Sequence, residues 1–321
     1  MSTSNSVTAG PQNSGQAYAP PAYPFRRLMA WCVRRELWEN RSITIAPFAA
    51  AGLMIFAILM LVTKLMANAA AIGGSVGGNV HPIPMWIPYM LIAAPIIAVG
   101  LIVAAAYCLG ALQGERRDRS ILFWKSLPVS DLTIVLSKAA IPIVVIPLVT
   151  FAAAMIAQLV IFAIVMSVVP MFGAQANLVW GGMHVGADTV RMLWAGTPIL
   201  YLTFGMLYGL LATALWHAPI FAWLLLVGGW ARRMTFLWAI APVMALEIIE
   251  RIVFGTTWLE SIIASRVYGS LSLAFAQVSD DSLPSFTPGH FLTAPGLWLG
   301  FAVAALFLGA AVFLRRYRQP I

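Results

Sequence analysis

The sequence predicts an all-α polytopic membrane protein with six transmembrane helices, and three observations support this fold class. Of the 321 residues, 61% are hydrophobic and only 9% are charged, whereas a soluble domain averages roughly 25% charged residues. The basic residues are also distributed very unevenly among the connections. Six stretches are apolar and long enough to cross a bilayer, which takes ~20 residues: Ile43–Thr63, Ile87–Leu112, Ala139–Val169, Trp194–Leu215, Met234–Phe254 and Gly296–Leu314.

The distribution of Lys and Arg predicts the orientation, because cytoplasmic loops of membrane proteins carry most of the basic residues. Only Lys64, Arg191, Arg251 and Arg266 fall in the other set of connections. We therefore expect a multi-pass protein of the cell (inner or plasma) membrane with both termini in the cytoplasm. The net charge of +8 indicates contact with anionic membrane lipid rather than nucleic acid. The other 15 of the 19 cations are Arg26, Arg27, Arg34, Arg35, Arg41, Arg116, Arg117, Arg119, Lys125, Lys138, Arg232, Arg233, Arg315, Arg316 and Arg318.

The chain before the first crossing has two parts. Residues 1–24 have no charged side chain and no apolar run, so we predict a disordered tail. The segment 25–42 is predicted to be an amphipathic helix in the headgroup plane, although Glu36 returns to its apolar face. A plain basic flank of the first crossing is the alternative. The pattern rests on apolar Phe25, Leu28, Met29 and Cys32 and on basic Arg26, Arg27 and Arg34.

Three later segments are not simple crossings. Ala139–Val169 is longer than a bilayer requires, so this helix is expected to be tilted, kinked or projecting. His217–Trp230 is apolar but, at about 14 residues, too short to cross comfortably, and we interpret it as an interfacial or re-entrant helix on the cytoplasmic side. If it crosses, the topology after it changes. The extracytoplasmic loop 255–295 is expected to form one or two short helices on the outer surface.

The cytoplasmic connection 113–138 combines charges with large apolar side chains. A dense run of both charge signs is followed by Ile-Leu-Phe-Trp and then by a proline turn, after which Ser130 is a suitable N-cap. Apolar anchors rimmed by charges are typical of a docking surface, while an aromatic belt at the lipid interface is the alternative. The candidate docking residues are Glu115, Arg116, Arg117, Asp118, Arg119, Phe123 and Trp124.

The motifs of several enzyme classes are missing. A phosphate-binding P-loop requires lysine directly after glycine, and none of the three lysines, Lys64, Lys125 and Lys138, follows one. Any ATP-driven work must therefore come from another chain. Gly73–Gly77 matches G-x-S-x-G, but this motif needs a strand–turn–helix elbow, so a glycine-rich linker is the better interpretation. The four histidines lack the spacing of a metal site. We predict no catalytic and no metal-binding residues.

One ionisable cluster lies within a predicted crossing. Glu247, Glu250 and Arg251 are spaced i, i+3, i+4 near the outer end of the fifth stretch. Ionisable residues at membrane depth are candidates for function, and the alternative is an interfacial ion pair between Glu247 and Arg251. The other five crossings contain no Asp, Glu, Lys, Arg or His, which disfavours an ion-coupled carrier.

Three of these segments together resemble a known family. Arg35–Ser42, the Glu115–Asp131 loop and the WLLLVGGWARR stretch Trp223–Arg233 resemble permease subunits of ATP-binding-cassette transporters of the ABC-2 exporter type. The resemblance implies a six-helix permease domain over 43–321, with cytoplasmic coupling and interfacial helices. It implies that 25–42 is a connector helix, with Arg34, Arg35, Glu36 and Glu39, and that Gly114–Trp124 is the coupling helix. His217–Arg233 would be a second element facing the ATPase.

The resemblance also implies partners. The chain would pair with a second permease copy or a homologue, and each copy would bind a separate ABC ATPase subunit that holds ATP and Mg, leaving no cofactor on this chain. The expected function is therefore the translocation path of an ATP-driven exporter, without enzymatic activity of its own. A non-transporting membrane scaffold that anchors a peripheral partner is the alternative. A polytopic enzyme using Ser75 or the Glu247–Glu250 pair is a third, with no converging residues.

Overall fold

The computed structural model describes residues 24–67, 86–117, 130–176, 179–180, 183–184, 199–231, 233–276 and 285–317. The described chain is almost entirely helical, apart from two antiparallel pairs of two-residue strands. Five helical segments are long and apolar enough to cross a membrane, so the chain is an all-α, multi-pass membrane protein. They are Ser42–Lys64, Tyr89–Gly114, Asp131–Ser167, Ile199–Trp216 and Pro295–Tyr317. The predicted tail 1–24 lies outside the described residues, except for Pro24.

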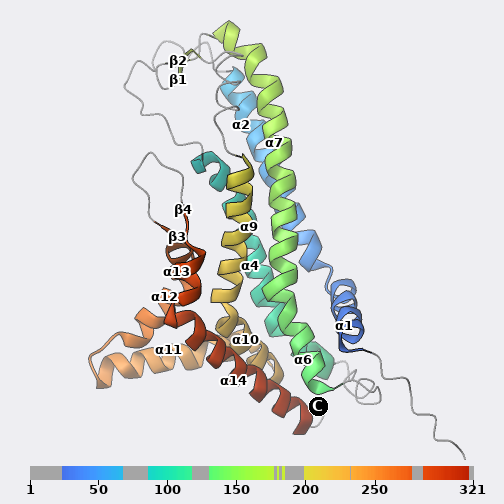
Figure 1. The fold of residues 1–321 in the computed structure, drawn as a ribbon, viewed down its shortest axis with the longest axis vertical. Coiled ribbons are helices and arrows are strands. Elements are labelled where there is room, and N and C mark those ends of the chain that lie inside the picture. Colours follow the sequence, from blue (N-terminus) through green and yellow to red (C-terminus); the bar gives the residue numbers. More distant parts are fainter. Residues whose placement is uncertain are drawn as a thin grey trace, which may run out of the picture.

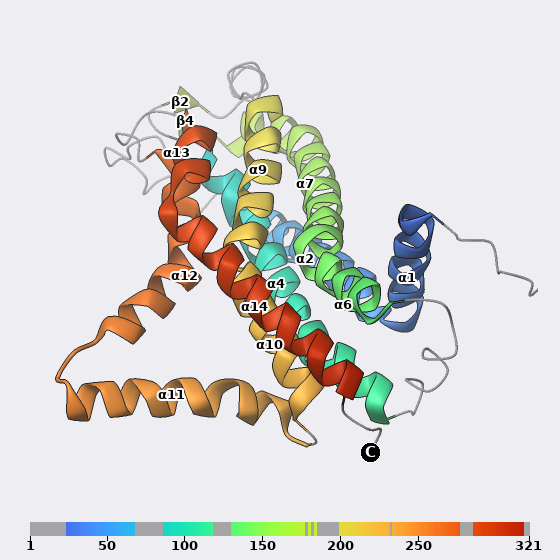
Figure 2. The same cartoon turned by 60° about the horizontal axis from the view of Figure 1, so that its bottom comes forward.

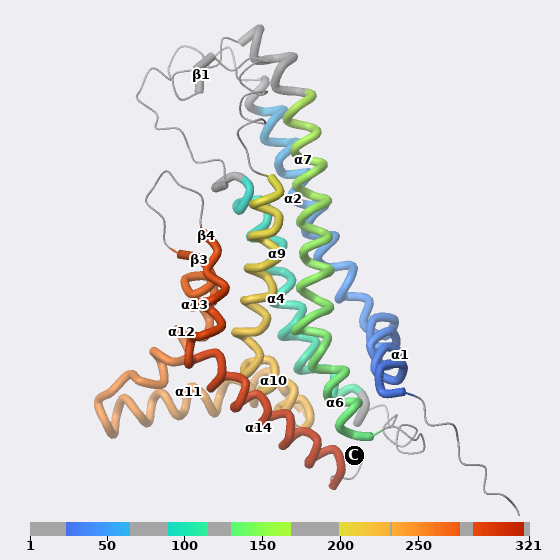
Figure 3. The backbone as a smooth tube through the Cα atoms, viewed as in Figure 1, coloured from blue at the N-terminus to red at the C-terminus, as the bar shows by residue number. Residues whose placement is uncertain are grey.

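Four long helices run side by side along the long axis of the molecule (Figures 1 and 3). Three of them meet through alanines that are almost completely buried: Ala51, Ala93, Ala153, Ala154 and Ala157. Small side chains let the backbones of membrane helices approach closely, which increases their van der Waals contact. The bundle helices are α2 (Ser42–Ala67), α4 (Trp86–Arg117), α7 (Ile146–Ala176) and α9 (Ile199–Trp216), and α1 (Phe25–Glu39) lies beside one end of the bundle.

The third predicted crossing belongs to a longer helical segment. The helices α6 (Asp131–Ala140), η1 (Ile141–Val145) and α7 follow one another without a gap. The π-helical turn η1 includes Pro142, whose missing N–H and bulky ring disturb a regular α-helix. A wider turn accommodates this defect without ending the helix. The segment extends beyond the predicted crossing at both ends, and α6 places its polar first turn outside the predicted apolar stretch.

The segment after α9 corrects the sequence interpretation. The helix α10 (Ala218–Trp230) continues from α9 after His217, and it packs between α4 and α14. Its side chains Phe221 and Leu225 belong to a buried core cluster. Of the two predicted alternatives, an interfacial helix would have one polar face in water, and α10 has no such face, whereas a re-entrant helix can be buried in protein. It is apolar around its whole circumference, and one side is buried in the core while Trp230 on the other is 40% exposed.

The predicted fifth crossing is a helix, but the expected total of six crossings is not confirmed. The helix α11 (Thr235–Val253) carries three ionisable residues in its last two turns and is not among the five candidate spans. Figure 2 shows α11 leading away from the base of the bundle and α12 (Trp258–Ala274) returning to it. The chain turns at Met234, with a φ of 53°, and at Gly255, with a φ of 63°. Left-handed backbone at both corners reverses the chain abruptly.

The segment before the last helix packs against α9. The expected short helices within 255–295 are present as α12 and α13, while their place on an outer surface stays a prediction. The rings of Phe286 and Phe275 cover Gly205 and Gly209 of α9, where an added Cβ would lie 2.8 Å and 3.2 Å from a ring carbon. The elements are β3 (Phe275–Ala276), β4 (Ser285–Phe286), α13 (Pro288–Thr293) and α14 (Pro295–Tyr317), and β1 (Val179–Trp180) pairs with β2 (Met183–His184) elsewhere.

Arg266 on α12 joins three helices. Its guanidinium lies 4.4 Å from the ring centroid of Trp216, and it donates hydrogen bonds to the carbonyl oxygens of Trp216 and Gly296. Trp216 in turn donates from Nε1 to the carbonyl of Ser265 at 3.1 Å. A guanidinium offers five donors in a rigid plane, so one side chain satisfies carbonyls at the end of α9 and the start of α14.

We predict that Gly228→Ala destabilises the bundle by roughly 1–3 kcal/mol. A Cβ at Gly228 would lie 2.7 Å from the backbone oxygen of Leu109 on α4, and backbone atoms cannot rotate away. The matched control is Gly110→Ala on α4, where a Cβ meets nothing within 4 Å and alanine improves helix propensity. Thermal unfolding in detergent, followed by far-ultraviolet circular dichroism, measures both variants. Equal unfolding midpoints would contradict the close α4–α10 contact.

Candidate functional site

The candidate functional site lies at the α1 end of the bundle. There α1 packs against α6, and the start of α6 also lies near the end of α14 (Figure 1). The start of α6 follows the segment 118–129, which contains most of the predicted docking residues. Two ion pairs hold α6 in place: one links it to α1 and the other links it to α14.

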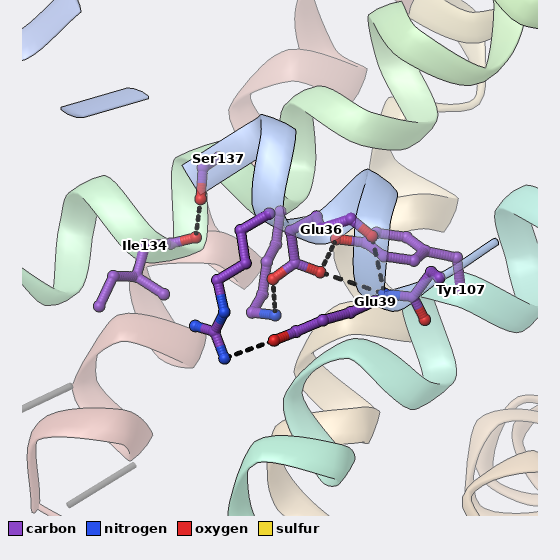
Figure 4. A network of polar contacts seen from close by, with 8 residues as sticks. Glu36, Glu39, Tyr107, Ile134 and Ser137 are labelled. Atoms are coloured by element: carbon purple, nitrogen blue, oxygen red, sulfur yellow. Dashed lines mark hydrogen bonds and ion pairs between the residues drawn. The ribbon is translucent and has the colours of Figure 1, made fainter. Parts of the chain in front are cut away.

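The first ion pair is Glu36 of α1 with Lys138 of α6. Lys138 Nζ lies 2.6 Å from Glu36 Oε1, and the two side chains are only 2% and 7% exposed. The hydroxyl of Tyr107 on α4 donates to Glu36 Oε2 at 2.9 Å, and Asn40 Nδ2 approaches the same oxygen at 3.4 Å. Figure 4 shows both carboxylate oxygens of Glu36 engaged. A buried carboxylate therefore joins three helices.

This pair explains the anomaly in the amphipathic pattern of α1. Cys32 and Glu36 are its two buried residues and lie one turn apart, so they share a face. That face also presents Val33 and Leu37 to the core. A buried carboxylate is costly unless it is paired and hydrogen-bonded. Glu36 is on the apolar face of α1 because Lys138 and Tyr107 meet it there.

Cys32 lies within the same contact between α1 and α6. Burial raises the pKa of its thiol above the usual range, although a hydrogen bond with Ser137 opposes the rise. The hydroxyl of Ser137 donates to the carbonyl of Ile134 at 2.8 Å within α6. Since the thiolate is the reactive form of cysteine, burial between α1 and α6 lowers the reactivity of Cys32.

The second ion pair is Asp131 with Arg315. Arg315 Nε donates to Asp131 Oδ1 at 3.0 Å, and the Arg315 side chain is 4% exposed. Asp131 is the first residue of α6, and Ser130 caps this helix by accepting a hydrogen bond from the Thr133 N–H. The predicted N-cap is therefore confirmed. An acidic residue in the first turn also interacts favourably with the helix dipole. The first turn of α6 is fixed both locally and to α14.

The outer face of α1 differs from the predicted one. Trp31 and Trp38 are both 72% exposed, and the Arg34 guanidinium lies 5.5 Å from the Trp38 ring centroid. Arg35 and Glu39 form an exposed i, i+4 ion pair at 2.6 Å. Of the predicted apolar face, Cys32 is buried against protein, whereas Phe25 is 53% exposed. The helix therefore presents indoles and arginines outwards, a combination that favours the interface of an anionic membrane.

The structure describes only part of the predicted docking set. Glu115, Arg116 and Arg117 form the last residues of α4, so the charged run begins as a continuation of that helix. Asp118, Arg119, Phe123 and Trp124 lie outside the described residues, as do Ser75 and the rest of Gly73–Gly77. The arrangement of the docking loop therefore stays a prediction.

The ionisable cluster on α11 stabilises the turn between α11 and α12. Glu250 accepts hydrogen bonds from the Thr256 hydroxyl and from the backbone N–H groups of Trp258 and Leu259. It thereby caps the start of α12. Arg251 pairs with Glu260 at 2.6 Å, and among the described residues no ion pair joins it to Glu247. The predicted Glu247–Arg251 interaction is wrong, because the reversal at Gly255 brings α12 within reach.

The described residues at this end of the bundle join helices through ion pairs and hydrogen bonds. Within the ranges that the structure describes, no three His, Cys, Asp or Glu side chains gather as a metal site would require. What sequence reasoning missed is the role of Lys138, which was counted only as a cytoplasmic cation. A lysine on an otherwise apolar stretch next to a misplaced glutamate is the signal that could have identified the pair.

Comparison with known proteins finds no family model, no curated protein and no solved structure that matches the chain.

We predict that Lys138→Met alone destabilises the protein by about 3 kcal/mol, because it leaves the Glu36 carboxylate buried without its cation. The double variant Glu36→Gln with Lys138→Met should recover most of this loss, since neither buried charge remains. The matched control is Glu39→Gln, which breaks an exposed pair on the same helix and should change stability by less than ~1 kcal/mol. Thermal unfolding in detergent checks the set. Additive losses in the double variant would show that the two residues do not interact.

We predict a pH-dependent readout of the α1–α6 contact. In a Cys108→Ala background, Cys32 should react slowly with maleimide at neutral pH and faster only as the pH rises above the usual thiol range, because burial raises its pKa. Lys138→Met should accelerate labelling at neutral pH, because a loosened α1 exposes the thiol and removes the burial that raises its pKa. Slower labelling in Lys138→Met would mean that α1 stays docked and the thiol has only lost a nearby cation.

Proposed function

We propose that this chain is the permease subunit of an ATP-driven exporter of the ABC-2 type. It would form the translocation path and couple to a separate ATPase subunit in the cytoplasm. The proposal rests on the family resemblance of three segments and on the absence of a P-loop in the sequence. The apolar bundle with few ionisable residues in its five candidate spans supports it, because an ion-coupled carrier needs such groups at membrane depth.

The observation that carries the proposal is the double attachment of α6. A subunit driven from outside must convert a push on a loop into motion of helices, so the loop must end on something rigid. The segment 118–129 is followed by Ser130 and Asp131, where Arg315 binds the start of α6 to α14, and Glu36 binds Lys138 in the last turn of α6 to α1. A displacement of the loop would therefore reach both helices instead of being absorbed locally.

The finer topology belongs to the same proposal. With α9 and α10 as one kinked crossing and α11 as the fifth, six crossings place both termini in the cytoplasm. The α1 end then faces the ATPase, in keeping with the arginines and lysines found there. The ATPase would hold ATP and Mg, and a second copy of this chain or a homologue would complete the path. His217–Arg233 would reach the ATPase only at its last residues, because α10 is buried.

The mechanism is a rocking motion. ATP binding brings two ATPase subunits together and pulls the two docking loops with them. The helices α6, η1 and α7 form one uninterrupted helical segment. The pull is therefore passed along this segment to the far end of the bundle. The π turn at Ile141–Val145 is the natural point of bending, because its hydrogen bonding is already irregular.

We predict that a nucleotide-hydrolysing subunit co-purifies with the tagged chain from its native membrane. Replacing Arg116 and Arg117 by Glu and Phe123 and Trp124 by Ala should release it, because these changes remove the charges and anchors of the docking loop. Glu39→Gln, an exposed change on α1, is the control that should retain it. Co-purification that survives the loop variant would contradict the assigned docking residues.

The same complex separates transport from a scaffold role. In a permease, adding ATP and Mg should alter hydrogen–deuterium exchange in α6 and α14. The double variant Glu36→Gln with Lys138→Met should weaken this response while the partner stays bound. A scaffold would bind the partner without any response to nucleotide, and this outcome would replace the proposal by its alternative.

A further inference from the structure

A wholly apolar groove lies between α10 and α14. Its volume is about 770 Å³, and its walls are four residues of α10 and six of α14, with no ionisable side chain among them. Trp223 and Trp230 form one wall, and Phe313 closes the α1 end of the other. Figure 2 shows α10 and α14 beside each other, with α11 starting next to them. The groove is therefore located in the half of the bundle nearest to α1.

The groove is preformed, because α11 holds both indoles in place. Trp223 donates from Nε1 to the carbonyl of Ala239 at 3.1 Å, and its ring lies 5.4 Å from that of Phe307. Trp230 packs edge-on against Trp238, with ring centroids 4.9 Å apart. A site whose walls are fixed before binding loses little conformational entropy on occupation.

Basic residues stand at the α1 end of the groove. Arg316 follows the lining residues Phe313 and Leu314 on α14, and Arg233 comes three residues after Trp230. Arg233 and Arg316 are both exposed. An apolar channel that ends at exposed guanidinium groups matches one occupant in shape and charge: a chain of hydrocarbon ending in a phosphate. Basic pockets between transmembrane helices on the cytoplasmic side suit anionic lipid headgroups.

We propose that the α10–α14 groove binds one anionic phospholipid of the adjacent leaflet. An acyl chain lies against Trp223 and Trp230, and the phosphate is held by Arg233 and Arg316. This site is distinct from the α1–α6 contact and does not depend on an ATPase partner. It also differs from ordinary lipid contact, because an apolar wall and two exposed basic residues near it in the chain would together select the ligand.

Brominated lipids test the proposal directly, because bromine quenches nearby tryptophan fluorescence. The full chain is reconstituted in phosphatidylcholine vesicles that contain a small fraction of phosphatidylglycerol with brominated chains, or the same fraction of brominated phosphatidylcholine. The phosphatidylglycerol should quench at a lower mole fraction. Replacing Arg233 and Arg316 by Gln should reduce this preference roughly tenfold, since each basic residue adds to the attraction of an anionic surface. Equal quenching of the wild-type chain by both lipids would overturn the proposal.

A variant that fills the groove provides a second test of the proposal. Gly309 lines the groove, and a Cβ there meets nothing within 4 Å, so Gly309→Phe should occupy the space without strain and abolish the preference. Gly110→Phe on α4 is the matched control, because that position is equally open and outside the groove. Circular dichroism confirms that both variants are folded. Preference that persists in Gly309→Phe, or is lost in Gly110→Phe, would show that the lipid binds elsewhere.

Discussion

The arrangement of the α1 end depends on burying one ion pair, Glu36 with Lys138. Removing two charges from water is costly, and the cost is recovered only when geometry and hydrogen bonds are good. Here the carboxylate meets an ammonium at 2.6 Å and a tyrosine hydroxyl at 2.9 Å. Because these partners come from three helices, the pair is satisfied only when α1, α4 and α6 are all in place. An apolar contact would tolerate sliding, whereas this one specifies a single register.

Because this register is fixed, the helices at the α1 end are held rigidly to one another. Hydrophobic contacts such as those of Val33 and Leu37 add stability without direction. The ion pairs add direction, and they sit at both ends of α6: Asp131 in its first turn and Lys138 in its last. A helix held at both ends to different neighbours moves as a unit with them. This property is what a subunit driven through its loops requires, and a passive anchor has no need of it.

The sequence predicted where the helices lie along the chain better than it predicted what their side chains contact. Apolar length identified all five candidate spans, because lipid leaves a backbone no alternative to the helix, although the third begins at Asp131 and not at the predicted Ala139. Composition could not reveal which helices face protein: α10 was predicted to be interfacial or re-entrant, and only the structure shows that Leu225 is fully buried. The contacts of Glu36 and Arg251 also escaped prediction, because their partners Lys138 and Glu260 depend on how the chain folds back. Only an irregularity, a glutamate on an apolar face, pointed to the first of them.

The α10–α14 groove and the Asp131–Arg315 ion pair share one helix, α14. Its residues Phe313 and Leu314 line the groove, and the next residue, Arg315, turns to the other side and pairs with Asp131. Adjacent side chains on a helix point about 100° apart, so one turn of α14 can line the groove and form the ion pair at the same time. Any movement of α6 that displaces Arg315 must then move the groove wall as well. A lipid seated between α10 and α14 would oppose that movement by filling the space into which α14 could shift, and the leaflet composition would thereby influence how readily the α1 end moves.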